Sequence, residues 1–103
     1  MQLGEVVGTL VSTRKDPKMV GMTFLVVKNL DAEMRALGTY SVAVDTVGAG
    51  VGDVVLHVGG SSARMTETTN ERASDASIIA IVDAVEIEGR YTYEKARRES
   101  PSA

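Results

Sequence analysis

Glycines alternate with other residues in the stretch VDTVGAGVGDVV, and a glycine-rich loop of this kind is one way to hold a phosphate. A dinucleotide-binding loop needs the spacing G-x-G-x-x-G and a following helix, whose N-terminus receives the pyrophosphate. Here Gly48, Gly50 and Gly52 have the spacing G-x-G-x-G, another apolar run follows, and no Gly-Lys-Ser/Thr comes after them. The pattern therefore favours a tight backbone passage over a cofactor site.

Asp45 begins a second motif that could do chemistry. Asp45-Thr46, then a valine, then Gly48-Ala49 resembles the D-T-G-A stretch of dimeric aspartic proteases, in which two aspartates share a proton. Val47 interrupts that stretch, and one inserted residue reverses the facing of side chains in the adjoining strand. We therefore interpret Asp45 as a strand-end aspartate that accepts hydrogen bonds from nearby backbone amides.

His57 and Asp83 are single polar residues within apolar runs. His57 is the one histidine of a chain without cysteine, so no second imidazole or thiolate completes a metal site, and we interpret it as a structural or interface residue. A general base would need a nucleophile or substrate site beside it, which the sequence does not reveal. Asp83 must face solvent, a hydrogen-bond network or a partner. We predict no catalytic, cofactor-binding or metal-binding residues.

Short β-branched runs must position these residues. Alternation predicts a half-buried strand from Gly38 to Asp45, with Tyr40, Val42 and Val44 on one face. Thr39, Ser41, Ala43 and Asp45 lie on the other face. The other predicted strands are Leu3–Thr13, Thr23–Leu30, Asp53–Val58 and Ile78–Ile87, and a short helix is expected over residues 61–67. The fold class is therefore all-β, a small five-stranded OB-like Greek-key barrel with one short helix.

Length and composition limit the possible functions. The 103 residues suit one small core, so we expect a barrel domain over residues 1–89 and a C-terminal tail over 90–103, partly ordered at most. The net charge of −3 argues against nucleic acid as a partner, since such binding depends on cations that neutralise phosphates. The sequence shows neither a signal peptide nor a membrane-length apolar run, so we expect no membrane partner and a cytoplasmic location.

Three separated stretches agree in sequence and order with one known family. They are VVGTLVSTRKDPKMVGMTFLVVKNLD, VAVDTVGAGVGDVVLHVGGSSAR and DASIIAIVDAVE. Together they resemble the EutN/CcmL family, the pentameric vertex proteins of bacterial microcompartment shells, over roughly residues 3–88. The resemblance implies an OB-like barrel that forms homopentamers and caps the vertices of an icosahedral shell, with hexameric shell proteins as partners. Such a protein is structural rather than an enzyme and carries no cofactor.

The resemblance also implies which residues meet the neighbouring shell proteins. The family's G-A-G-x-G-E and I-V/I-D stretches form the rim of the pentamer, and here they correspond to Gly48, Ala49, Gly50, Val51, Gly52 and Asp53, and to Ile81, Val82 and Asp83. Asp53 replaces the usual Glu, which keeps the charge and shortens its reach. Ser12 and Thr13 are expected to line an axial pore. The alternative function is an oligonucleotide-binding OB-fold domain; a small hydrolase is a further candidate.

Overall fold

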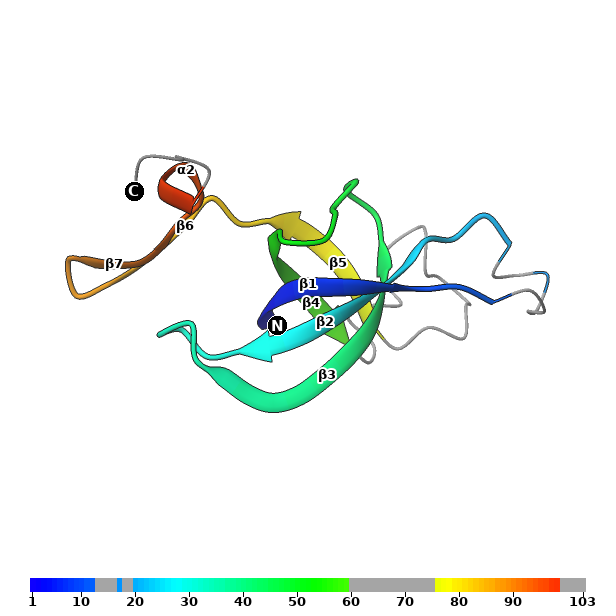
Figure 1. The fold of residues 1–103 in the computed structure, drawn as a ribbon, viewed down its shortest axis with the longest axis horizontal. Helices are drawn as coiled ribbons and strands as arrows, with labels where there is room; N and C mark the ends of the chain where they lie inside the picture. The colour runs from blue at the N-terminus through cyan, green and yellow to red at the C-terminus, as the bar shows by residue number, and fades with distance from the viewer. Residues whose placement is uncertain (13–16, 18–19, 60–75, 99–103) are drawn as a thin grey trace.

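A computed structural model describes residues 1–12, 17, 20–59 and 76–98 (Figure 1). The described residues are mostly in β-strands, and one helical turn follows the last of these strands. The elements are β1 (Gln2–Leu10), β2 (Phe24–Leu30), β3 (Ala36–Asp45), β4 (Val54–Gly59), β5 (Ala76–Ile81), β6 (Ala84–Ile87), β7 (Arg90–Glu94) and α2 (Lys95–Arg98). The helix expected over residues 61–67 lies outside the described residues.

Five strands close into a barrel in the order β1-β2-β3-β5-β4, with β4 paired back onto β1. All pairs are antiparallel except β3 with β5, which run parallel because the connection from β3 returns through β4 before β5. Closure leaves no unpaired barrel edge to recruit another strand. The predicted five-stranded barrel is confirmed.

Small and β-branched side chains fill the barrel. The buried cluster consists of Val6, Leu25, Val27, Ala43, Val55, Ala76 and Ile78. Space is tight where β1 crosses β2, because a Cβ on Gly4 would overlap Val27 Cγ1 and lie 2.9 Å from the Lys28 carbonyl oxygen. Gly4 therefore allows close approach of the two strands, as glycine does where backbones meet.

The alternation predicted in β3 is present, but most of its apolar face points away from the core. Ala43 belongs to the core, whereas the side chains of Tyr40 and Val42 are 65% and 45% exposed. Val44 alone of the predicted face is fully buried. A period of two shows which residues share a face, and the closure of the barrel decides which face is inside.

The predicted strand Ile78–Ile87 is wrong as a single element. β5 ends at Ile81, and Val82 and Asp83 lead into β6, which pairs with β7 in a separate two-stranded sheet. The strand ends where its barrel partner ends. The Val82 N–H donates to the carbonyl of Val54, the first residue of β4, at 2.7 Å, and beyond this bond the chain leaves β4. The first part of the predicted tail thus forms β7 and α2, while residues 99–103 lie outside the described residues.

The β6–β7 hairpin and α2 project from one end of the barrel (Figure 1). Polar contacts to the β2–β3 turn hold the hairpin. The Arg90 guanidinium lies 2.9 and 3.1 Å from the two carboxylate oxygens of Glu33, and Thr92 Oγ1 donates to the Ala32 carbonyl at 2.8 Å. No described helix has the length and apolarity to cross a membrane.

Candidate functional site

The loop between β3 and β4 is organised by the carboxylate of Asp45. Asp45 Oδ1 accepts hydrogen bonds from the backbone N–H groups of Val47, Gly48 and Ala49, at 3.0, 3.1 and 3.2 Å. These are the local backbone bonds expected of a strand-end aspartate, and all three are accepted by Oδ1. Asp45 is therefore a structural residue.

Asp53 closes the other end of the same loop. Its Oδ2 accepts a hydrogen bond from the Gly50 N–H at 2.9 Å, and its own N–H donates to the Gly50 carbonyl at 3.0 Å. Asp53 Oδ1 lies 3.8 Å from Lys95 Nζ of α2. The Asp53 carboxylate thus has two partners within the chain, the Gly50 N–H and the Lys95 ammonium.

β1 fixes the loop to the barrel. The Gly52 N–H donates to the Val6 carbonyl at 2.8 Å, and the Val6 N–H donates to the Asp53 carbonyl at 2.9 Å. Ala49 packs against the hydrophobic core. The C-terminal end of the loop is thus bonded to β1, and its other amides are bonded to the carboxylates of Asp45 and Asp53, so the loop is held at several points along its length.

The glycines of the loop have different roles. Gly48 and Gly52 have φ of +79° and +98°, a left-handed conformation that side chains disfavour. Gly50 does not have a positive φ, and a Cβ built on it would meet nothing within 4 Å. Within the chain, then, Gly48 and Gly52 are required by conformation, whereas Gly50 is not required by conformation or by space.

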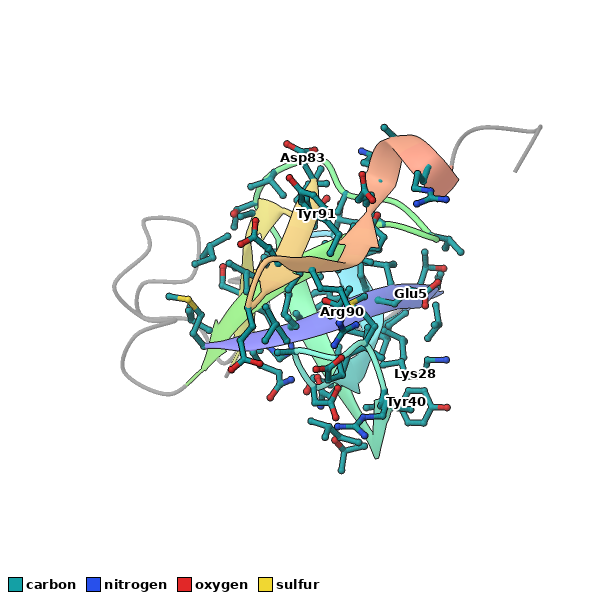
Figure 2. The ribbon with its side chains drawn as sticks, turned by 90° about the vertical axis from the view of Figure 1, so that its left-hand side faces the viewer. Glu5, Lys28, Tyr40, Asp83, Arg90 and Tyr91 are labelled. Carbon is teal, nitrogen blue, oxygen red and sulfur yellow. The ribbon has the colours of Figure 1, made fainter. Side chains whose placement is uncertain are left out.

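Residues 81–83 lie beside this loop. Ile81 packs against the core, Val82 is bonded to Val54 at the start of β4, and Asp83 is exposed. Figure 2 shows Asp83 at the outer end of β5. The structure therefore brings together the two predicted rim segments, residues 48–53 and 81–83, which we call the rim.

Lys95 connects the two rim segments, and the sequence analysis missed it. Its backbone N–H donates to the Asp83 carbonyl at 2.8 Å while its ammonium faces Asp53. The available sequence signal was the alternation of Tyr91 and Tyr93 just before it, which is typical of a strand. That strand, β7, carries Lys95 back to the barrel.

His57 lies inside the barrel, away from the rim segments. Its Nε2 is 2.9 Å from Asn29 Oδ1, and Asn29 Nδ2 donates to Thr39 Oγ1 and Ser41 Oγ at 3.0 and 3.1 Å. Burial lowers the pKa of His57 below its ordinary value, and the N-terminal amine lowers it further. A neutral histidine held by an amide fits the structural interpretation.

The remaining predictions concern the pore and metal binding. Ser12 follows the end of β1 and is exposed, whereas Thr13 lies outside the described residues. Across the described part of the chain, no three His, Cys, Asp or Glu side chains gather as a metal site would require.

Comparison with known proteins gives this arrangement a family. The sequence model described as "Ethanolamine utilisation protein EutN/carboxysome" matches residues 1–83. The carboxysome shell vertex protein CcmL of Synechococcus elongatus is 48% identical over 95 residues, which cover 92% of this chain and 96% of that protein. The solved structure of CcmL from Gloeobacter violaceus is 43% identical, with a TM-score of 0.88 over 93% of this chain and 99% of that chain.

A relative from another type of shell is also similar. GrpN of Rhodospirillum rubrum, described as a pentameric microcompartment shell protein, is 44% identical, with a TM-score of 0.77 over 84% of this chain and 99% of that chain. Both the sequence match and the barrel extend over most of the protein. The chain therefore belongs to the EutN/CcmL family of microcompartment shell vertex proteins, which are structural proteins rather than enzymes.

Proposed function

We propose that five copies of this chain form a closed ring that caps a vertex of an icosahedral microcompartment shell in the bacterial cytoplasm. Family membership and the pentameric state of the relative GrpN support this function. A flat layer of six-fold tiles cannot close on itself, whereas five-fold units introduce the curvature that a closed shell needs. Head-to-tail contacts around a five-fold axis close into a ring of fixed size.

We further propose that the rim contacts the hexameric shell proteins around each vertex. The observation that carries this proposal is the geometry at Gly50. It has no conformational need to be glycine, and the space beside it is open in the single chain. A bare backbone in a loop of fixed shape allows another protein to approach closely.

The remaining rim residues have complementary roles. The Asp53 carboxylate accepts a hydrogen bond from the Gly50 N–H, which helps to fix the backbone conformation of residues 48–52. Val51, which is 66% exposed, offers apolar surface to a neighbour. The exposed carboxylate of Asp83 offers an acceptor for a cationic or N–H group of the tile.

Ser12 and Thr13 remain the proposed polar residues of an axial pore. Ser12 is exposed beyond the end of β1, where a hydroxyl can meet solvent. Oligonucleotide binding, the alternative function of an OB-like barrel, is not favoured by the net charge of −3. A salt-sensitive affinity for single-stranded oligonucleotides would support that alternative instead.

Co-expression with hexameric shell proteins tests the rim. Gly50→Trp fills the open space and Asp83→Lys reverses the charge, so both variants should form rings of five but leave shells unclosed, as seen by electron microscopy. Ala32→Trp, on the exposed β2–β3 turn, is the matched control and should support closed shells. If shells close equally well with Gly50→Trp and Asp83→Lys, the rim assignment is wrong. If native mass spectrometry of the unmodified protein shows no five-subunit species, the ring itself is wrong.

A further inference from the structure

The outer side of β1, β2 and β3 carries apolar side chains that the chain itself leaves uncovered. Across these strands, Val26 is paired with Val42, and Lys28 is paired with both Glu5 and Tyr40. Figure 2 shows Glu5, Lys28 and Tyr40 following one another across the three strands. We call Val26, Lys28, Tyr40 and Val42 the outer face.

The exposure of this outer face is unusual for a barrel in water. Outward positions of antiparallel strands are ordinarily polar, because one face packs on the core and the other is solvated. Here Tyr40 and Val42 are exposed, and Val7, at the bulge of β1, is 40% exposed nearby. Neighbouring exposed apolar side chains of this kind mark an interaction surface.

The outer face continues into a groove beneath the C-terminal hairpin. The groove has a volume of about 460 Å³. Its lining from the barrel includes Lys28, Leu30 and Met34, and its lining from the hairpin and α2 includes Tyr91, Tyr93 and Arg97. Apolar, aromatic and charged side chains therefore line it together, and aromatic residues, Met and Arg are the types enriched at protein–protein interfaces.

The hairpin that walls the groove is not part of the barrel sheet. It is a sheet of two strands, and an isolated two-stranded sheet is marginally stable in water. Its ion pair with the barrel, Arg90 with Glu33, has side chains that are 65% and 35% exposed, so it adds little stability. A protein seated in the groove would cover the exposed side chain of Tyr91 and hold the hairpin in place.

We propose that a neighbouring copy of this chain occupies the outer face and groove, which thereby form one of the two surfaces that join copies into a ring. This inference rests on the proposed ring of five. A head-to-tail ring needs two different surfaces on each copy. The rim is already assigned to neighbouring shell proteins, while the outer face offers the apolar and aromatic surface that a permanent contact buries.

A nucleic acid is the competing occupant, because strands 2 and 3 of an OB barrel often carry its oligonucleotide site. Charge argues against it. The groove lining contains Glu5 and Glu94 as well as Lys28 and Arg97, so it does not present the excess of cations that phosphates require. A second copy, with its own mixed charges, suits this lining.

A tryptophan introduced on the outer face reports whether it is covered without disrupting it. The chain contains no tryptophan, so Tyr40→Trp provides a single tryptophan whose fluorescence can be excited selectively. In the assembled protein its emission should be shifted to shorter wavelength and its acrylamide quenching reduced several-fold relative to Val51→Trp on the rim. The Val51→Trp fluorophore should become shielded only after hexameric shell proteins are added. Equal quenching of the two fluorophores in assembled rings overturns the proposal while leaving the ring intact.

A charge placed in the outer face tests its contribution to assembly. Val42→Asp should lose the five-subunit species in native mass spectrometry and yield a monomer whose far-ultraviolet circular dichroism is unchanged. Val51→Asp is the matched control and should retain five subunits. A Val42→Asp protein that still forms rings of five contradicts the proposal, as does salt-sensitive binding of an oligonucleotide that is lost in Tyr40→Ala. Should Val42→Asp fail to fold, the quenching of Tyr40→Trp decides.

Discussion

Lys95 Nζ lies 3.8 Å from Asp53 Oδ1, so a residue near the end of the chain faces the loop between β3 and β4. The backbone N–H of the same lysine bonds the Asp83 carbonyl at 2.8 Å. One residue thereby links the C-terminal hairpin to both segments of the rim. The outline of the rim depends on residues that lie outside the rim itself.

Replacing Lys95 should loosen the hairpin more than it destabilises the fold. The two side chains are 31% and 26% exposed, and such an ion pair contributes about 0–1 kcal/mol after screening by solvent. Lys95→Met should therefore change the free energy of unfolding little, yet speed amide hydrogen exchange in β6 and β7. Lys95→Arg, which keeps the charge, is the control. Unchanged exchange in Lys95→Met would show that the lysine does not hold the hairpin.

Alanine at the three loop glycines should separate conformation from contact. Gly48→Ala and Gly52→Ala each place a side chain at positive φ, which costs about 1–2 kcal/mol of folding free energy. Gly50→Ala should leave stability nearly unchanged, since its Cβ meets nothing within 4 Å. Chemical denaturation of the three variants measures these differences. Equal losses at all three positions would contradict the distinct role given to Gly50.

Gly4 and Gly8 provide a matched pair within β1. A Cβ on Gly4 would overlap Val27 inside the barrel, whereas a Cβ on Gly8 would lie 3.9 Å from the nearest heavy atom, Val26 Cβ. Gly4→Ala should cost about 1–3 kcal/mol through overpacking, and Gly8→Ala far less. Thermal unfolding of both variants checks the difference. A Gly4→Ala protein as stable as Gly8→Ala would show that β1 and β2 can separate without cost.

His57 should make stability depend on pH in a defined window. Burial lowers the pKa of His57 in the folded chain below the ordinary histidine pKa of 6.5. As the pH falls below 6.5, the unfolded chain therefore binds more protons than the folded chain does. The free energy of unfolding should therefore be smaller near pH 5 than near pH 8. His57→Gln, which keeps a donor for Asn29, should flatten this dependence at fixed protein concentration. An unchanged slope in His57→Gln would assign the effect to another group.

Asp31 does not interfere with that measurement. A hydrogen bond from the Arg35 backbone N–H is the main cause that lowers the pKa of Asp31 below its ordinary 3.8. The stability that a carboxylate with a lowered pKa contributes is fully present above its ordinary pKa and is lost as the pH falls further. The effect of Asp31 on stability therefore appears below pH 3.8, whereas that of His57 appears as the pH falls below 6.5.

Local and periodic features could be predicted from the sequence because the interactions that create them are short in range. The three bonds to Asp45 reach amides two to four residues away, so a strand-end aspartate before glycines was enough to indicate them. The alternation in residues 38–45 likewise depends only on strand geometry. Together with the motifs shared with the family, these features predicted the barrel, whereas the assignment of residues 48–53 and 81–83 to a shell contact stays a prediction.

Only the tertiary structure decided which faces and ends those strands present. The alternation of side chains along β3 placed Tyr40 and Val42 on one face, but the closure of the barrel turned that face outward. The run Ile78–Ile87 reads as one strand by composition, yet it breaks at Asp83 where the barrel partner β4 is left behind. Lys95 meets Asp53 because the β6–β7 hairpin returns the chain to the barrel, and no local pattern encodes this contact between residues far apart in the sequence. The sequence determined what each segment can form, and packing among distant segments determined what each one faces.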